Sequence, residues 1–151
     1  MYKDKVWRKA CIFDDYMEVH MPFGYEINKK INDAYLYMEE KNKCILISRV
    51  EAKEESLQKQ IYTIYSVIKS NRKNVSEPSI MKRNWKGTEQ YMLRCSYGET
   101  KNIILTFFCK DQKQYLVQFS YIGHHIDGWR KECEYILNSI KFVKEKKENG
   151  N

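Results

Sequence analysis

The chain has 151 residues, of which 42% are hydrophobic and 14% aromatic, and its formal net charge is +7 at pH 7. This composition excludes a disordered chain, and the length suits one domain that buries roughly two-thirds of its unfolded surface without a disulfide or a metal. The longest apolar runs, CILI and NIILTFF, are of strand length and exclude a membrane-spanning helix. The basic excess favours acidic partners.

The cysteines and the opening segment both predict a cytoplasmic protein. The opening MYKDKVWRKACIF is basic, but neither an apolar signal-peptide core nor a small-residue cleavage site follows it. The cysteines are odd in number, form no CxxC pair and lie in apolar segments, which indicates buried, reduced thiols. They are Cys11, Cys44, Cys95, Cys109 and Cys133.

Period-two patterning predicts the first strands. In DDYMEVHMP, residues 14–22, apolar and polar side chains alternate, and Pro22 with Gly24 then turns the chain. Residues 34–38 and 43–50 flank the polar EEKNK, which predicts a hairpin whose second strand is central.

Two helices are predicted from an apolar stripe with the same spacing. The first covers residues 54–70, with Ser56 as its N-cap and Asn71 at its end. The second follows a turn at residues 123–125, with Asp127 as its N-cap, and ends at Asn138 or Ser139. Its stripe consists of Trp129, Cys133, Ile136, Leu137 and Ile140.

Between the helices, four strand-like runs are separated by short, turn-rich segments and predict an antiparallel meander. The runs are residues 79–86, 89–97, 101–108 and 114–122. The predicted fold class is therefore α+β, with a single antiparallel sheet of about six to seven strands and two main helices in the order β-ββ-α-ββββ-α. Residues 1–143 form the single predicted domain, and residues 144–151 a disordered charged tail.

This order resembles that of the PsbP-like superfamily, which includes bacterial DcrB-like proteins. Three segments carry the resemblance: DDYMEVHMPFGYEI, ILISRVEAKEESLQKQI, and the closing ECEYILNSIKF with its Ser-Ile-x-Phe ending. The resemblance implies a PsbP-like sandwich of sheet and helices. It also implies a binding role, because familiar members are adaptors, chaperones or accessory subunits and offer no catalytic motif or cofactor to carry over.

The residues themselves favour neither a metal site nor a catalytic site. His124 and His125 are adjacent in a turn and therefore point apart, and Asp127 is better used as a cap. A cysteine nucleophile could pair Cys109 with His124, or Cys133 with His125, but thiols within apolar faces behave as small hydrophobes. Motifs for phosphate loops and hydrolase elbows are absent from the sequence.

Partner binding is predicted instead, through aromatic and basic side chains on the sheet or its edge. Tyr and Trp are enriched at protein interfaces, although a helix covering the same sheet face would bury them. The predicted partner-binding residues are Tyr35, Tyr37, Lys82, Arg83, Trp85, Lys86 and Tyr91.

The predicted function is a non-catalytic, cytoplasmic protein-binding module without membrane insertion. We expect a chaperone or immunity partner of a secreted or toxic effector, with the basic rim steering a partner that has an acidic surface. The alternative is nucleic-acid binding by the basic patch between Lys69 and Lys86, and a second alternative is an unrecognised enzyme. The oligomeric state is left open by the sequence.

Overall fold

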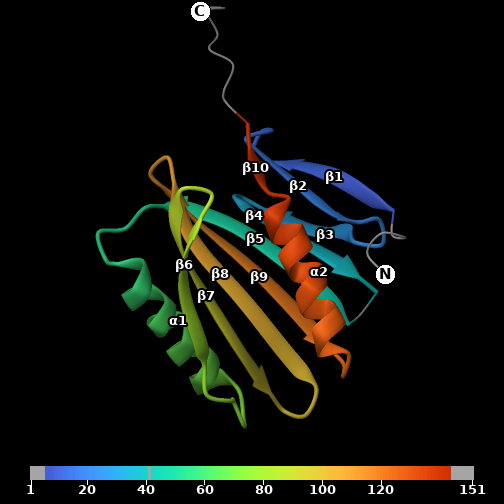
Figure 1. Cartoon of the computed structure of the whole chain (residues 1–151), viewed down its shortest axis with the longest axis vertical. Coiled ribbons are helices and arrows are strands. Elements are labelled where there is room, and N and C mark those ends of the chain that lie inside the picture. The colour runs from blue at the N-terminus through green and yellow to red at the C-terminus, as the bar shows by residue number, and fades with distance from the viewer. Residues whose placement is uncertain (1–5, 41, 144–151) are drawn as a thin grey trace, which may run out of the picture. The chain divides into compact units, whose positions relative to one another are not determined.

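The computed structural model describes residues 6–40 and 42–143 (Figure 1). The chain divides into two compact units. The terminal unit combines residues 1–26 with residues 125–151, and the central unit is Ile27–His124. The single domain over residues 1–143 stays a prediction, and the predicted tail at residues 144–151 lies outside the described residues.

The central unit is a seven-stranded sheet with one helix. Its strands lie in the order β3-β4-β5-β9-β8-β7-β6, so β3 and β6 are the edges. The β4–β5 hairpin and the β6–β9 meander are antiparallel, as predicted. The bounds are β3 Glu26–Ile31, β4 Ala34–Glu39, β5 Lys43–Glu51, α1 Leu57–Asn71, β6 Ser79–Trp85, β7 Thr88–Tyr97, β8 Lys101–Lys110 and β9 Lys113–Ile122.

Helix α1 covers one face of β7 and β8, as Figure 1 shows. The hydroxyl of Ser56 accepts a hydrogen bond from the backbone N–H of Lys59 at 3.2 Å, which confirms the predicted N-cap. From the helix, Ile61 and Tyr65 pack with Leu93 and Leu105 of the sheet in a buried cluster. Strand β8 is buried on both faces from Asn102 to Phe108, so side chains on either face of the strand are shielded from solvent there.

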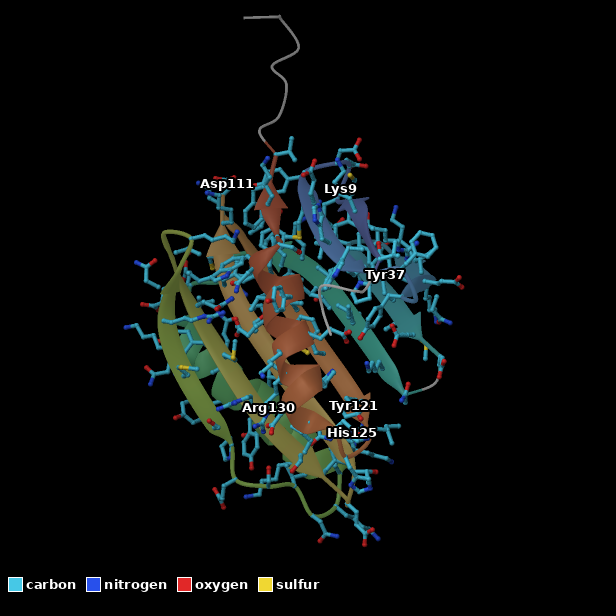
Figure 2. All side chains as sticks on the ribbon, turned by 45° about the vertical axis from the view of Figure 1, so that its right-hand side comes forward. Lys9, Tyr37, Asp111, Tyr121, His125 and Arg130 are labelled. Atoms are coloured by element: carbon cyan, nitrogen blue, oxygen red, sulfur yellow. The ribbon has the colours of Figure 1, made fainter. Side chains whose placement is uncertain are left out.

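The opposite face of the same sheet is apolar as well. Tyr37 of β4 and Tyr121 of β9 belong to this face, on the two strands that flank β5 (Figure 2). Strand alternation and the strand register add Ile45, Val117 and Phe119 to it, and all are buried. The central strand predicted for residues 43–50 is therefore apolar because one of its faces belongs to this core.

The terminal unit contains α2 Ile126–Asn138 and a small sheet of order β1-β2-β10, which corrects the prediction of a single sheet. Its strands are β1 Trp7–Ile12, β2 Met17–Pro22 and β10 Lys141–Phe142. The alternation predicted for β2 is confirmed, since Met17, Val19 and Met21 are fully buried. Strand β2 thus belongs to this second sheet and not to the larger one.

The structure differs from the sequence-based prediction in two further ways: it contains three strands that were not predicted, and the N-cap of α2 is a different residue. Strands β1, β3 and β10 were not predicted, because WRKACI and EINKKI carry too many polar residues and KF is too short to show a period. The N-cap of α2 is His125 and not Asp127, which lies in the first turn, where its carboxylate still faces the positive end of the helix dipole.

Candidate functional site

The predicted aromatic anchors lie inside the protein. Tyr35, Tyr37, Trp85 and Tyr91 expose between 5% and 8% of their surface. Tyr91 packs in the cluster under α1, and the ring of Trp85 lies 4.7 Å from that of Phe108. These four side chains therefore do not provide an accessible contact surface.

The predicted cations Lys82 and Lys86 are exposed, whereas Arg83 is half-buried. Lys82 forms an ion pair with Glu89 at 3.2 Å, which raises the pKa of the lysine. The Arg83 Nε–H donates to Gln90 Oε1 at 2.6 Å, so this guanidinium is engaged within the sheet. Lys86 lies with its ammonium 5.6 Å from the centre of the Trp85 ring. Partner binding by these residues stays a prediction.

A cation–aromatic group at the C-terminal end of α1 was not predicted from the sequence. The Arg72 guanidinium lies 5.4 Å and the Lys101 ammonium 5.5 Å from the centre of the Tyr97 ring. Tyr97 is the last residue of β7 and Lys101 the first of β8, so their turn brings them together. The basic stretch between Lys69 and Lys86 is thus extended by a residue that lies far along the chain.

The sequence reasoning also missed a half of the central sheet that α1 leaves uncovered. In β4, β5 and β9, buried residues alternate strictly with half-buried ones over most of each strand. The half-buried residues share the face on which α1 packs, because Leu46 lies opposite Leu36 on one side and Gln118 on the other. This alternation shows that one face of the three strands belongs to the core and the other to the surface.

The edge strand β3 continues this uncovered face. Lys30 lies over the Tyr35 ring, 5.5 Å from its centre, and therefore projects from the Tyr35 face of the hairpin. Strand alternation then places Ile27, Lys29 and Ile31 on the face of Leu36. All six residues of β3 are exposed.

We name the apolar part of this surface the open sheet face. Ile27, Ile31, Val50 and Ile122 expose between 47% and 53% of their surface and lie on this one face, with Val50 and Ile122 near its opposite ends. Lys29 is the one charged residue among the described residues on this face of β3, β4, β5 and β9. The open sheet face consists of Ile27, Ile31, Ala34, Leu36, Met38, Leu46, Val50 and Ile122.

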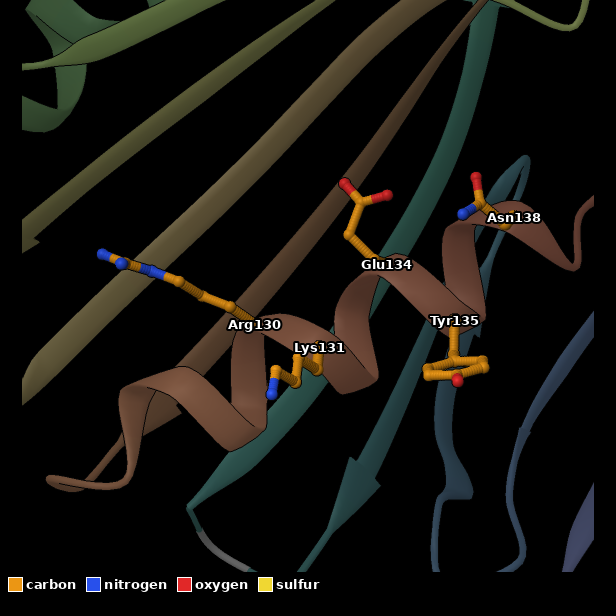
Figure 3. Close-up of a pocket in the computed structure, with 5 residues that line it drawn as sticks. All are labelled: Arg130, Lys131, Glu134, Tyr135 and Asn138. Carbon is orange, nitrogen blue, oxygen red and sulfur yellow. The ribbon is translucent and has the colours of Figure 1, made fainter. Parts of the chain in front are cut away.

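A second surface feature lies on α2 in the terminal unit. A hollow of about 280 Å³ is lined by side chains of this helix (Figure 3). The centre of the Tyr135 ring, which belongs to this lining, lies 6.3 Å from that of the Trp7 ring. Its lining mixes both charges, so the hollow has no evident preference for a ligand charge. The lining residues are Arg130, Lys131, Glu134, Tyr135 and Asn138.

The cysteines and histidines of the described residues do not form a metal-binding cluster. All five cysteines are free, and burial raises the pKa of the Cys95 and Cys109 thiols, which disfavours the nucleophilic thiolate. Of the thiols predicted to be buried, Cys95 and Cys133 are buried, Cys44 and Cys109 are half-buried and Cys11 is exposed. Within residues 6–40 and 42–143, the structure shows no group of three or more potential metal ligands, and neither helix described there is long and apolar enough to span a bilayer.

Comparison with solved structures identifies the fold. The yeast Ran-binding protein Mog1p superposes with a TM-score of 0.67 and 7% sequence identity, over 93% of this chain and 97% of Mog1p. Cyanobacterial PsbP from Synechocystis superposes with a TM-score of 0.65 and 12% identity, over 91% of this chain and 92% of that protein. The chain has the PsbP-like fold.

This likeness extends to proteins with unrelated descriptions. LpqN of Mycobacterium tuberculosis, described as involved in cell envelope biogenesis, superposes with a TM-score of 0.55 and 8% identity, over 93% of this chain and 92% of LpqN. No protein-family model and no curated protein sequence matches the chain. At such identities the likeness shows the fold alone, so function must be argued from the surface of this chain.

Proposed function

We propose that this PsbP-like chain is a non-catalytic protein-binding module that binds its partner across the open sheet face. The single observation that carries the proposal is that Ile27, Ile31, Val50 and Ile122, each about half exposed, lie on the same face of the central sheet. Large aliphatic patches cost free energy in water, and in folded proteins they mark surfaces that a partner covers.

The charges around the open sheet face favour an acidic partner. Lys29 lies on the face itself and Lys30 on the same strand, and the whole chain carries a net charge of +7. Charge of this sign attracts acidic surfaces at long range and raises the association rate, while burial of the apolar contacts slows dissociation. The partner should therefore present an apolar surface with acidic residues near it.

The more specific proposal is a chaperone or immunity partner of a secreted or toxic effector in the cytoplasm. A chaperone would cover an apolar segment of the effector, and an immunity protein would block its active surface. Both require a stable apolar interface, which the open sheet face can supply. The Ran-binding description of Mog1p supports a protein partner for this fold.

A capture experiment with matched variants tests the proposal. Tagged protein is incubated with lysate of its native host, washed at low and then high salt, and the retained proteins are quantified. The test variant is Val50→Lys with Ile122→Lys, which places two charges on the open sheet face in β5 and β9. The control is Tyr62→Lys with Val67→Lys, because these two α1 side chains are 49% and 55% exposed and lie outside the open sheet face.

We expect a stoichiometric protein that survives high salt, is lost with the test variant and is retained by the control. Its identity separates a chaperone from an immunity protein. Equal capture by both variants would place binding elsewhere on the chain. Loss of the retained protein at high salt from the wild-type chain would contradict an apolar interface.

Nucleic-acid binding is a second candidate function, favoured by the Arg72–Tyr97–Lys101 group. Cations that neutralise phosphates beside an aromatic ring are typical of single-strand binding surfaces. In this case the capture experiment should release nucleic acid as the salt concentration rises, and Arg72→Ala with Lys101→Ala should flatten the salt dependence. The Val50→Lys with Ile122→Lys variant should then capture as much nucleic acid as the wild type.

A further inference from the structure

The edge strand β3 presents a free hydrogen-bonding edge next to the open sheet face. Among the residues that the structure describes, it ends the strand order of the central sheet and is paired with β4 alone. Every residue from Glu26 to Ile31 is exposed, so the outer edge is reachable from solvent. Strand edges of this kind pair readily with an extended segment of another chain.

The side chains of β3 specify what such a segment would contain. In an antiparallel pair, directly opposite residues share a face and contact each other, so Ile27 and Ile31 favour apolar residues opposite them. Lys29 and Lys30 favour acidic residues, and Asn28 a polar one. Read antiparallel, the complementary segment is apolar, acidic, acidic, polar, apolar.

Pairing of β3 with a second copy of itself satisfies these preferences poorly. Antiparallel self-pairing centred on Lys29 would set the Lys29 side chains of the two copies directly opposite each other, and like charges on facing strands are destabilising. Lysines on an edge strand also hinder aggregation through that edge. Strand β3 carries two lysines against one acidic residue, Glu26, so its charge favours an acidic segment of a different protein opposite Lys29 and Lys30.

We propose that the partner docks by adding one antiparallel strand to β3, with its apolar side chains extending the open sheet face. The added strand would contribute backbone hydrogen bonds at the edge and two apolar contacts beside Ile27 and Ile31. Its acidic pair would neutralise Lys29 and Lys30, the positions that otherwise protect the edge. This inference rests on the proposed protein-binding function and names its docking mode.

A synthetic peptide with the core Val-Glu-Glu-Thr-Val, flanked by threonines, tests the docking mode on the full chain. Affinity is measured by fluorescence anisotropy, and the docking place by amide hydrogen exchange of β3. Two control peptides are used: one is N-methylated at alternate residues, which removes the donors along one edge, and one has both glutamates replaced by lysine. The protein alone is measured over a range of concentrations.

We expect saturable binding and slowed amide exchange between Ile27 and Ile31. The N-methylated and lysine peptides should lose binding, because one lacks the donors and the other repels β3. The variant Lys29→Glu with Lys30→Glu should bind the glutamate peptide about tenfold more weakly. The matched variant Lys59→Glu with Lys69→Glu, which changes the net charge equally at two exposed positions of α1, should bind like the wild type.

Several results would overturn the docking mode. Equal binding of the N-methylated peptide would show that strand pairing is not used, and equal weakening by the two charge variants would show attraction by net charge alone. The docking mode would also be contradicted if the glutamate peptide did not bind, or if it left the amide hydrogen exchange of β3 unchanged. Concentration-dependent protection of β3 in the protein alone would identify a second copy as the occupant.

The docking mode and the proposed function fail separately. The capture experiment places its substitutions on Val50 and Ile122, away from β3, and reports on the open sheet face. If the Val50→Lys with Ile122→Lys variant loses the partner but the glutamate peptide does not bind, the proposed function is supported and the strand-addition mode is contradicted. If the peptide binds but the lysate yields no protein partner that survives high salt, the proposed function is contradicted.

Discussion

Gln60 of α1 and Gln114 of β9 are joined by two reciprocal amide hydrogen bonds. The Gln60 Nε2 donates to Gln114 Oε1 at 3.0 Å, and the Gln114 Nε2 donates to Gln60 Oε1 at 2.8 Å. The Gln60 Nε2 also donates to the carbonyl oxygen of Glu55, and the Gln114 Oε1 also accepts from the backbone N–H of Lys53. The pair therefore ties α1 and the segment before it to the sheet.

Removal of one amide of this pair should destabilise the central unit. Both side chains are buried, with 6% and 1% of their surface exposed. Gln114→Leu removes the donor to Gln60 Oε1 and the acceptor of the Lys53 N–H, while the Gln60 Nε2 keeps its bond to the Glu55 carbonyl. We expect a loss of about 1–3 kcal/mol in the free energy of unfolding, measured by urea denaturation. The double variant Gln60→Leu with Gln114→Leu should recover part of this loss, and exposed Gln58→Leu should change stability little. Equal losses for Gln58 and Gln114 would contradict the role of the pair.

Leucine truncation should distinguish the covered from the uncovered part of the α1 face. Leu105 is fully buried beneath α1, whereas Leu36 on the open sheet face is half-buried. Leu105→Ala should cost about 2–5 kcal/mol because it leaves a cavity, and Leu36→Ala about 1 kcal/mol because solvent fills the site. The midpoints of thermal unfolding provide the measurement. Similar losses at both positions would mean that Leu36 is covered in the free protein.

Alkylation should follow the exposure and the pKa of each thiol. Cys11 is exposed, while burial raises the pKa of the Cys95 and Cys109 thiols and lowers their thiolate fraction at a given pH. Iodoacetamide at about pH 8 should therefore modify Cys11 first, as followed by mass spectrometry of peptides. The same shift contributes stability below the unfolded thiol pKa of about 8.5, and this contribution is lost as the pH rises through the higher folded value. Fast labelling of Cys95 in the folded chain would be inconsistent with this order.

Ser139 connects the end of α2 to β2 in the terminal unit. Its hydroxyl oxygen accepts from the His20 backbone N–H at 2.8 Å and lies 3.1 Å from the His20 carbonyl oxygen. Ser139→Ala should lower the free energy of unfolding by about 1 kcal/mol, since the exchange loses one net hydrogen bond. Ser70→Ala serves as the control, because that exposed hydroxyl bonds to Ser66 within α1 alone. Equal free energies of unfolding for the two variants in urea denaturation would contradict the stabilising role of Ser139.

The local pattern of apolar residues was sufficient to predict most of the elements. The stripe from Leu57 to Ile68 marked α1, and the short turns between the last four runs marked the meander. Strand alternation also suffices to set Tyr35 and Tyr37 on the side opposite Leu36. These features depend on residues within one element or one turn, which the sequence displays directly.

The same patterns could not show which side of a strand faces the core. Tyr35 and Leu36 are both apolar enough for burial, and the choice between their faces depends on what covers each side of the finished sheet. Likewise EINKKI shows no strand period, because β3 is an edge strand exposed on both faces and its pairing with β4 is made through the backbone.

The sequence by itself therefore determined the α+β class, both helices, the hairpin and the meander, because periodicity and turn chemistry are local. The tertiary structure alone decided that the predicted aromatic anchors are buried, that β2 belongs to a separate small sheet, and that an aliphatic face remains uncovered. Those properties depend on strand partners distant in the chain and on the limited width of α1, which covers β7 and β8 but not the β3–β4–β5 half of the sheet.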